Sequence, residues 1–188
     1  MRRGRRCRSS DERGAALVET AILIPVVILV TFGLIEFSSA YQSSSVASAA
    51  ARSGARVASA EAKLSTYATD AAAAAATALH TVPSNEPVEM WVYRALTNGY
   101  PDSGNFTTCA AYCTKYTWLP ASRTFDIANP GGNGWLYSDQ QACNQTAWDS
   151  VGVYVKLRHK FLTQLFGASI TLADHAVFRL EPAPTSAC

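Results

Sequence analysis

The chain has 188 residues, the length of one modest domain with additional segments, and 48% of them are hydrophobic against 16% charged. The formal net charge is only +2, yet six arginines lie within the first 13 residues, so the remainder is slightly acidic. A folded nucleic-acid-binding surface would cluster basic residues and interleave them with aromatic side chains. Composition and charge therefore exclude nucleic acid as an expected partner.

A long apolar segment follows the arginine-rich start. Residues 15–37 are interrupted only by Glu19 and Glu36. As a helix rising about 1.5 Å per residue, they would span roughly 34 Å, enough for a hydrocarbon core of about 30 Å. No Lys or Arg follows until Arg52, so the positive-inside rule predicts a cytoplasmic amino terminus and an extracytoplasmic remainder. We expect a basic leader at 1–14 and one transmembrane helix in a lipid bilayer at 15–37.

A conventional secretory signal peptide is the alternative interpretation of the same segment. Such a peptide has a charged start, an apolar region of about 7 to 15 residues and cleavage after small residues, for which "FSSA" at 37–40 is a candidate. The uncharged run at 20–35 is slightly longer than that range. The alternative function is then a secreted or cell-surface binding domain.

Two stretches resemble a known family. "RGAALVETAILIP" at 13–25 resembles the class III signal of type IV pilin-like proteins, and "FGLIEF" at 32–37 makes the segment similar to TadE-like pseudopilins of the Tad (Flp) pilus system. The resemblance implies cleavage by a prepilin peptidase between Gly14 and Ala15, with Glu19 as the fifth residue of the mature chain. It also implies a non-enzymatic minor pseudopilin of the inner membrane, with other Tad pilus subunits and the membrane assembly platform as partners.

Glu19 is an unusual residue for a segment that lies in lipid. Inserting a carboxylate at the centre of a membrane helix costs about 2.5 to 3.5 kcal/mol. Cleavage after Gly14 would create an ammonium group at Ala15, near the positive end of the helix, and both charges favour a nearby carboxylate. Glu19 is thus a candidate charge partner in assembly, and the alternative is a boundary residue tolerated near the lipid headgroups.

Residues 38–82 are rich in alanine, the strongest helix former, so they predict a long helix that continues from the membrane. Gly54 and the serines at 43–45 are its weak points. The small side chains at 46–60 would permit the close approach of a neighbouring helix in a filament, although alanine helices also occur without a partner. A low-complexity linker is the alternative.

The remainder, 83–188, predicts a small β-rich extracytoplasmic domain. Residues 88–96, 150–159 and 169–182 alternate apolar and polar side chains, which is typical of strands, and "KFLTQLFG" forms a short apolar connector between the last two. Three strands need a cover on one face, and the alanine-rich helix can provide it. The predicted fold class is therefore α+β, with a long amino-terminal helix packed on a small antiparallel sheet of about three strands.

An irregular insertion is expected at about 97–149, because this stretch is rich in turn residues. Cys109, Cys113 and Cys143 lie within it, and Cys188 ends the chain. In an oxidising compartment these four cysteines allow three pairings, of which we expect Cys143 to join Cys109 or Cys113. The Cys-x-x-x-Cys spacing has no second nearby pair, so no metal is expected.

The sequence contains no pattern that predicts catalysis. The three histidines are scattered, and there is no Gly-x-Ser-x-Gly elbow, phosphate-binding loop or His-Glu-x-x-His motif. We therefore expect neither an enzyme nor a cofactor.

Overall fold

The computed structural model describes residues 8–80, 85–143, 148–164, 166–183 and 188. The chain divides into two compact units, Met1–Ser39 and Ala40–Cys188. Of the expected leader 1–14, residues 1–7 lie outside the described residues, and the side chains of 8–13 are not described either. The expected boundary at 82–83 also lies outside the described residues. In the first unit, the described residues belong to the helix α1, Arg8–Ala60, which continues into the second unit and contains Pro25. A proline inside a helix removes one backbone hydrogen bond.

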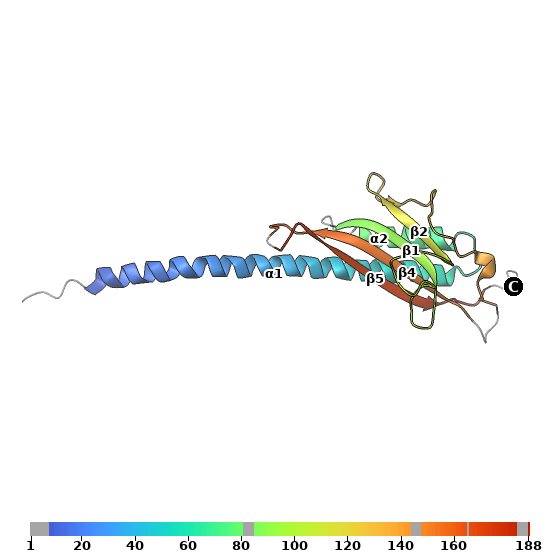
Figure 1. Ribbon diagram of the computed structural model, residues 1–188, viewed down its shortest axis with the longest axis horizontal. Helices are drawn as coiled ribbons and strands as arrows, with labels where there is room; N and C mark the ends of the chain where they lie inside the picture. Colours follow the sequence, from blue (N-terminus) through green and yellow to red (C-terminus); the bar gives the residue numbers. More distant parts are fainter. Residues whose placement is uncertain (1–7, 81–84, 144–147, 165, 184–187) are drawn as a thin grey trace, which may run out of the picture. The chain divides into compact units, whose positions relative to one another are not determined.

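The second unit is built on one antiparallel sheet with the strand order β3-β2-β1-β4-β5 (Figure 1). Three strands are long: β1 (Asn85–Ala95), β4 (Ser150–Lys160) and β5 (Ser169–Arg179). These are the three strands predicted from alternation, and the α+β class is confirmed. β4 and β5 pair in one continuous register from Ser150↔Arg179 to Lys160↔Ser169, so they form a regular hairpin.

The sheet has five strands rather than about three, because the insertion contributes two of them. β2 (Cys113–Leu119) pairs with β1, and the short β3 (Thr124–Phe125) pairs with β2. The prediction of an irregular insertion was therefore wrong for residues 113–125. β2 alternates Thr and Lys with aromatic side chains, which is a strand pattern, but the surrounding turn residues obscured it. The rest of the insertion has only the short 3-10 helix η1 (Tyr137–Asp139) among its described residues.

The alanine-rich segment forms two helices instead of the single helix expected over 38–82. α1 ends at Ala60, a turn follows, and α2 runs from Tyr67 to Leu79. Lys63 in the turn has a φ of 68°, its backbone N–H donates to Gln140 Oε1 at 2.7 Å, and its Nζ donates to the Ser138 carbonyl at 2.8 Å. The reversal lets both helices bury alanines against one sheet, which a straight helix could not do.

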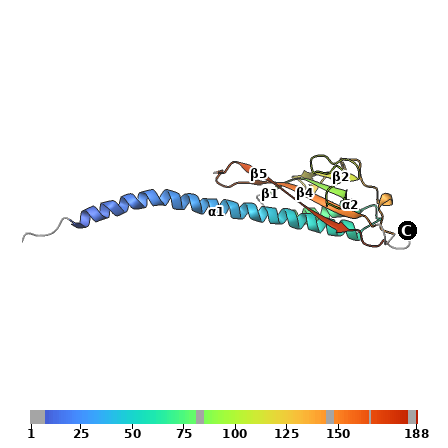
Figure 2. The ribbon, with the colours of Figure 1, turned by 60° about the horizontal axis from the view of Figure 1, so that its bottom comes forward.

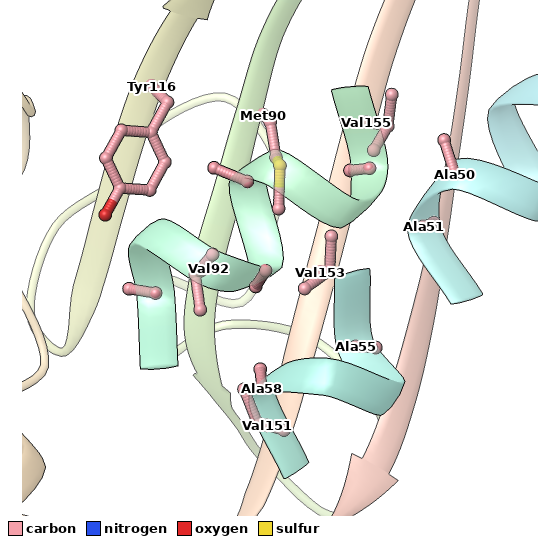
Figure 3. Close-up of a cluster of buried hydrophobic side chains, with 14 of the residues drawn as sticks. Ala50, Ala51, Ala55, Ala58, Met90, Val92, Tyr116, Val151, Val153 and Val155 are labelled. Atoms are coloured by element: carbon pink, nitrogen blue, oxygen red, sulfur yellow. The ribbon is translucent and has the colours of Figure 1, made fainter. Parts of the chain in front are cut away.

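The core lies between the sheet and the two helices, α1 from Ala40 onward and α2, which cover the same face (Figure 2). Figure 3 shows Met90, Val153 and Val155 directed from β1 and β4 towards the helices. The helices contribute mainly buried alanines: Ala47, Ala50, Ala51, Ala55, Ala58, Ala71, Ala72, Ala75 and Ala76. The buried small side chains at 46–60 thus permit close packing inside the chain. The close approach of a neighbouring helix in a filament stays a prediction, for which Ala49 and Ala60 are the exposed alanines of this stretch.

Gly54 lies where α1 comes close to both α2 and the sheet. A Cβ at this position would lie 3.1 Å from the backbone oxygen of Ala71 and 3.3 Å from Cγ1 of Val153. Glycine therefore weakens the helix locally but is required by the packing.

Candidate functional site

The first candidate site is the exposed apolar surface of α1 before the folded unit. Within the described residues, α1 from Gly14 to Ala60 is the one helix long and apolar enough to cross a membrane, and its most apolar part is almost entirely unburied. Exposed large side chains include Leu17, Val18, Ile22, Leu23, Ile24, Val26, Val27, Ile28, Leu29, Val30, Leu34 and Ile35. A helix of a soluble core would bury such residues, whereas this one presents them to lipid or to other proteins.

Gly14 and Ala15, the predicted processing site, lie together in α1 and are both exposed. A Cβ at Gly14 would meet no atom within 4 Å, and Gly14 is not among the glycines with a positive φ. Neither packing nor backbone conformation in the described chain therefore requires glycine here.

Glu19 is exposed one turn further along α1. Among the residues whose side chains the structure describes, Glu19 takes part in none of the four ion pairs Arg94–Asp102, Lys115–Glu89, Lys156–Glu89 and Lys160–Glu86. The hydroxyl of the next residue, Thr20, donates to the Ala16 carbonyl at 2.7 Å, so this polar group is satisfied within the helix. Glu19 thus presents an exposed carboxylate among exposed apolar side chains.

A second feature lies at the Ala40 end of the folded unit. His159, at the end of β4, is fully buried, and its Nδ1 lies 2.8 Å from the Ser43 hydroxyl of α1 and 3.4 Å from Asn85 Oδ1 of β1. This polar cluster ties the helix to two strands. Sequence analysis missed it, because residues 43, 85 and 159 are far apart and a lone histidine gives no signal of its neighbours.

The connector between β4 and β5 also contains apolar residues. "KFLTQLFG" is apolar, whereas loops that face water are usually polar. Leu162 in this loop is 81% exposed and Phe166 is 47% exposed. The expected apolar connector thus has at least two exposed large side chains, Leu162 and Phe166.

The outer face of the sheet, opposite the helices, is covered by the part of the insertion before β2. Phe106 stacks on Tyr154 with ring centroids 4.5 Å apart and also contacts Trp91 and Tyr93. Next to this cluster, Glu89 pairs with Lys115 at 2.6 Å and with Lys156 at 3.4 Å. Burial alone would raise the pKa of the Glu89 carboxyl, but the hydrogen bonds and positive charges of the two lysines outweigh it and lower the pKa.

The cysteine pairing differs from the predicted one. Cys109 is bonded to Cys113, and Cys143 is bonded to Cys188. Cys109 and Cys113 flank the turn that enters β2, with their Cα atoms 5.4 Å apart. The end of the chain returns along the segment before β4, where the Ala183 N–H donates to the Ala142 carbonyl, and this return places Cys188 beside Cys143. No pattern along the chain indicates that return.

The histidines and carboxylates do not converge on one place. Among the described residues, no three His, Cys, Asp or Glu side chains are grouped so that they could hold a metal ion. His80 lies over Trp118, His159 lies in the buried polar cluster, and His175 packs beside Phe106.

The described chain is thus an α+β protein in which a helix able to cross a membrane leads into a disulfide-bonded unit of helices on an antiparallel sheet. A family model described as TadE-like protein matches residues 14–56. The match begins at Gly14, includes Glu19 and ends before α2, so the resemblance seen in the sequence is confirmed over this part of the chain. Neither a curated protein nor a solved structure matches the chain.

Proposed function

We propose that the chain is a non-enzymatic minor pseudopilin that contributes to assembly of a Tad (Flp) pilus or a related secretion apparatus. The observation that carries the proposal is the combination of Gly14 and Glu19 at pilin-like spacing within the segment similar to TadE-like proteins. The exposed apolar surface of α1 supports it, because this surface needs either lipid or partner helices.

In this proposal a prepilin peptidase removes residues 1–14, and 15–37 anchor the protein in the cytoplasmic membrane. The alanine-rich segment 38–82 and the β-rich segment 83–188 are extracytoplasmic. The arginines before the apolar segment favour this orientation, and the two disulfides suit an oxidising compartment.

Glu19 is the proposed assembly residue. After cleavage, its carboxylate offsets the Ala15 ammonium, either within one chain or between a subunit and its neighbour. Opposite charges attract much more strongly in a medium of low dielectric constant than in water, so the pair would be effective between packed apolar helices. The exposed position of Glu19 leaves its carboxylate accessible to such a partner.

A secreted or cell-surface binding domain is the second candidate, and one observation favours it. The folded unit begins at Ala40, so conventional cleavage after "FSSA" would leave all of that unit except Ala40 itself. Amino-terminal sequencing of the mature protein separates the two proposals. A start at Ala15 is expected for the pseudopilin, and a start at Tyr41 or later would contradict it.

The variant Glu19→Gln tests the assembly role. The amide keeps the size of the side chain and is easier to bury than a carboxylate, so membrane insertion and cleavage after Gly14 should persist. Co-purification with other pilus subunits and the number of pili should fall sharply. Glu181→Gln, which changes an exposed glutamate near the end of the chain, is the matched control and should leave both unchanged. Normal piliation in Glu19→Gln would show that this carboxylate is only a boundary residue.

A further inference from the structure

The strand β5 forms one edge of the sheet, and no described strand pairs with its outer side (Figure 1). Its register with β4 is continuous and without a bulge, and its sequence contains neither proline nor lysine. Proteins usually protect a sheet edge with a short strand, a proline, a lysine or a bulge, because a long open edge pairs readily with another strand. β5 is therefore a candidate contact surface.

The opposite edge of the sheet is much shorter. β3 comprises only Thr124–Phe125, and β2, β1 and β4 each have a neighbouring strand on both sides. Among the described strands, β5 is thus the one long strand with an open side. If two copies of this chain extend each other's sheets, the contact is β5 with β5. A two-fold axis perpendicular to the sheet makes this pairing antiparallel and closed.

The backbone groups that β5 directs outward follow from the hydrogen bonds at the two ends of the hairpin. The Phe161 N–H donates to the Ala168 carbonyl, and the Leu180 N–H donates to the Asp149 carbonyl. Hydrogen-bonded and non-hydrogen-bonded pairs alternate along an antiparallel ladder, so even-numbered residues of β5 bond to β4 and odd-numbered residues face away. The outward residues are Ser169, Thr171, Ala173, His175, Val177 and Arg179.

Side chains select the register of a pair built on these groups. A two-fold axis at Asp174 would place this carboxylate directly opposite its copy, which is unfavourable. An axis at His175 instead places Asp174 of one copy opposite Ala176 of the other. It also places Phe178, which is 38% exposed, opposite Leu172 of the other copy, on the side of the sheet that faces the helices. The axis at His175 therefore buries an apolar side chain and avoids the contact between like charges.

His175 lies at the proposed two-fold axis. Its ring packs beside Tyr100 and Phe106 of the same chain on the outer face of the sheet. Its backbone N–H donates to Asp174 Oδ1 at 2.8 Å, so this carboxylate occupies one of the outward donors in a single chain. Pairing exchanges that hydrogen bond for one to the His175 carbonyl of the other copy, and the Asp174 carboxylate is released.

The released carboxylate comes level with a basic part of α1 in the other copy. Gly54 of α1 lies beside Val153 of β4, and Val153 is paired with Ala176, so the helix around Gly54 is level with Ala176. In the register centred on His175, Ala176 lies opposite Asp174 of the other copy. That carboxylate is therefore level with the helix around Gly54.

Arg52 is the cation of α1 that this carboxylate can reach. The Glu181 N–H, just beyond β5, donates to the Ser59 carbonyl, so the Ser59 side of α1 faces the β5 edge. Arg52 lies seven residues before Ser59 and thus on the same side of the helix. Arg52 is exposed and takes part in none of the four ion pairs of the described chain. The two copies are therefore complementary in charge across the axis.

We propose that two copies of this chain pair antiparallel through β5, with a two-fold axis at His175, and join their five-stranded sheets into one continuous sheet. Backbone hydrogen bonds between the two edges provide the affinity. A second copy is the occupant that the structure favours, because in this register β5 matches itself in backbone groups, in the burial of Phe178 and in the pairing of Arg52 with Asp174. The inference goes beyond the proposed function and depends neither on a membrane span nor on a pilus.

The test measures distances between two copies of the full chain in detergent micelles. In a Cys7→Ser background the remaining cysteines are bonded as disulfides, so a nitroxide label can be attached through Thr171→Cys or, in a second protein, through Ser169→Cys. Both positions are exposed. With the axis at His175, the paired labels lie eight and twelve residues apart along the strands, which is about 27 Å and about 41 Å. Double electron–electron resonance should show both separations.

Other distances would overturn the proposal. An axis at Asp174 would shorten both separations by two residues, to about 20 Å and about 34 Å, and would refute the charge argument. Absence of a dipolar signal at both positions would show that β5 does not pair with itself. Because the readout involves neither insertion nor piliation, such a failure would leave the proposed function unaffected.

A proline substitution provides the second measurement. Ala173→Pro removes an outward N–H and leaves the hydrogen bonds between β5 and β4 in place, so it should abolish both distances. Ala173→Thr keeps the N–H at the same position and is the matched control, which should retain them. Persistence of both distances in Ala173→Pro would assign the contact to another surface and overturn the proposal.

A charge exchange tests the contact between Arg52 and Asp174. Arg52→Glu or Asp174→Arg alone should weaken dimerisation in sedimentation experiments, and the two together should restore it, because opposite charges again face each other. Arg123→Glu, on the opposite edge of the sheet, is the control and should have no effect. A dimer that forms only after Asp174→Asn would show that Asp174 blocks self-pairing and would contradict the proposal.

Discussion

Gly152→Ala should destabilise the folded unit, because no space exists for a methyl group at this position. Gly152 of β4 is paired with Tyr93 of β1, and a Cβ on Gly152 would lie 2.2 Å from Cζ of the Tyr93 ring. That ring is fully buried, contacts Phe106 and donates its hydroxyl to the Gly99 carbonyl at 2.9 Å. It cannot move aside without losing these contacts.

The magnitude follows from three contributions. Overpacking a tight core costs about 1 to 3 kcal/mol, and loss of the Tyr93 hydroxyl hydrogen bond costs about 1 kcal/mol. Replacing glycine by alanine in a strand returns about 0.5 to 1 kcal/mol, because the unfolded chain has less backbone freedom. The net expectation is a loss of about 2 kcal/mol, which corresponds to a fall in Tm of about 4 to 8 °C for a unit of this size.

The assay is urea unfolding of the disulfide-bonded protein in detergent, followed by near-ultraviolet circular dichroism of its buried aromatic residues. Gly131→Ala is the matched control, since a Cβ there would come no closer than 3.8 Å to Lys115 and should change the free energy of unfolding little. In a Tyr93→Leu background, which removes the ring, the added methyl of Gly152→Ala should cost much less. Equal unfolding midpoints for Gly152→Ala and Gly131→Ala would refute the reasoning.

Three further predictions concern stability. Gly54→Val should lower the free energy of unfolding by about 2 to 3 kcal/mol, because the backbone at Ala71 cannot yield; unchanged urea midpoints would contradict this close approach. Glu89→Gln should cost about 1 kcal/mol at neutral pH and flatten the loss of stability in acid. Because the pKa of Glu89 is lowered in the folded state, its ionised carboxylate stabilises the protein at pH values above the ordinary pKa of a glutamate. This contribution is lost as the pH falls through the ordinary pKa towards the folded-state pKa. Urea titrations from pH 3 to 7 that show parallel curves for both proteins would exclude a stabilising role for the carboxylate. Replacing both Cys143 and Cys188 by Ser removes a disulfide between residues 45 positions apart and should cost about 4 kcal/mol of the free energy of unfolding. Removing the Cys109–Cys113 disulfide, which spans four positions, should cost about 2 kcal/mol. Reversal of this order in thermal unfolding would count against the argument from loop entropy.

Most helices and strands of this protein could be predicted from the sequence. The apolar segment 15–37, the alanine-rich helices and the strands β1, β4 and β5 each follow a repeating pattern of side chains, and such patterns depend only on neighbours along the chain. Gly14 and Glu19 could be proposed as processing and assembly residues because they lie five positions apart in a segment that resembles TadE-like proteins. β2 was missed because polar and aromatic side chains alternate over only four of its seven residues, 115–118, and turn residues surround the strand.

The tertiary structure decided everything that depends on residues distant in sequence. The helix reversal at Lys63 turned one expected helix into two and directed the buried alanines inward rather than towards other subunits. The return of the chain end selected Cys188 as the partner of Cys143. The contact between Ser43 of α1 and His159 of β4 joins positions that are 116 residues apart in the sequence. A sequence pattern specifies which face of an element is apolar, but the partner of that face is selected by the packing of the whole core, so these arrangements could not be derived from any one segment.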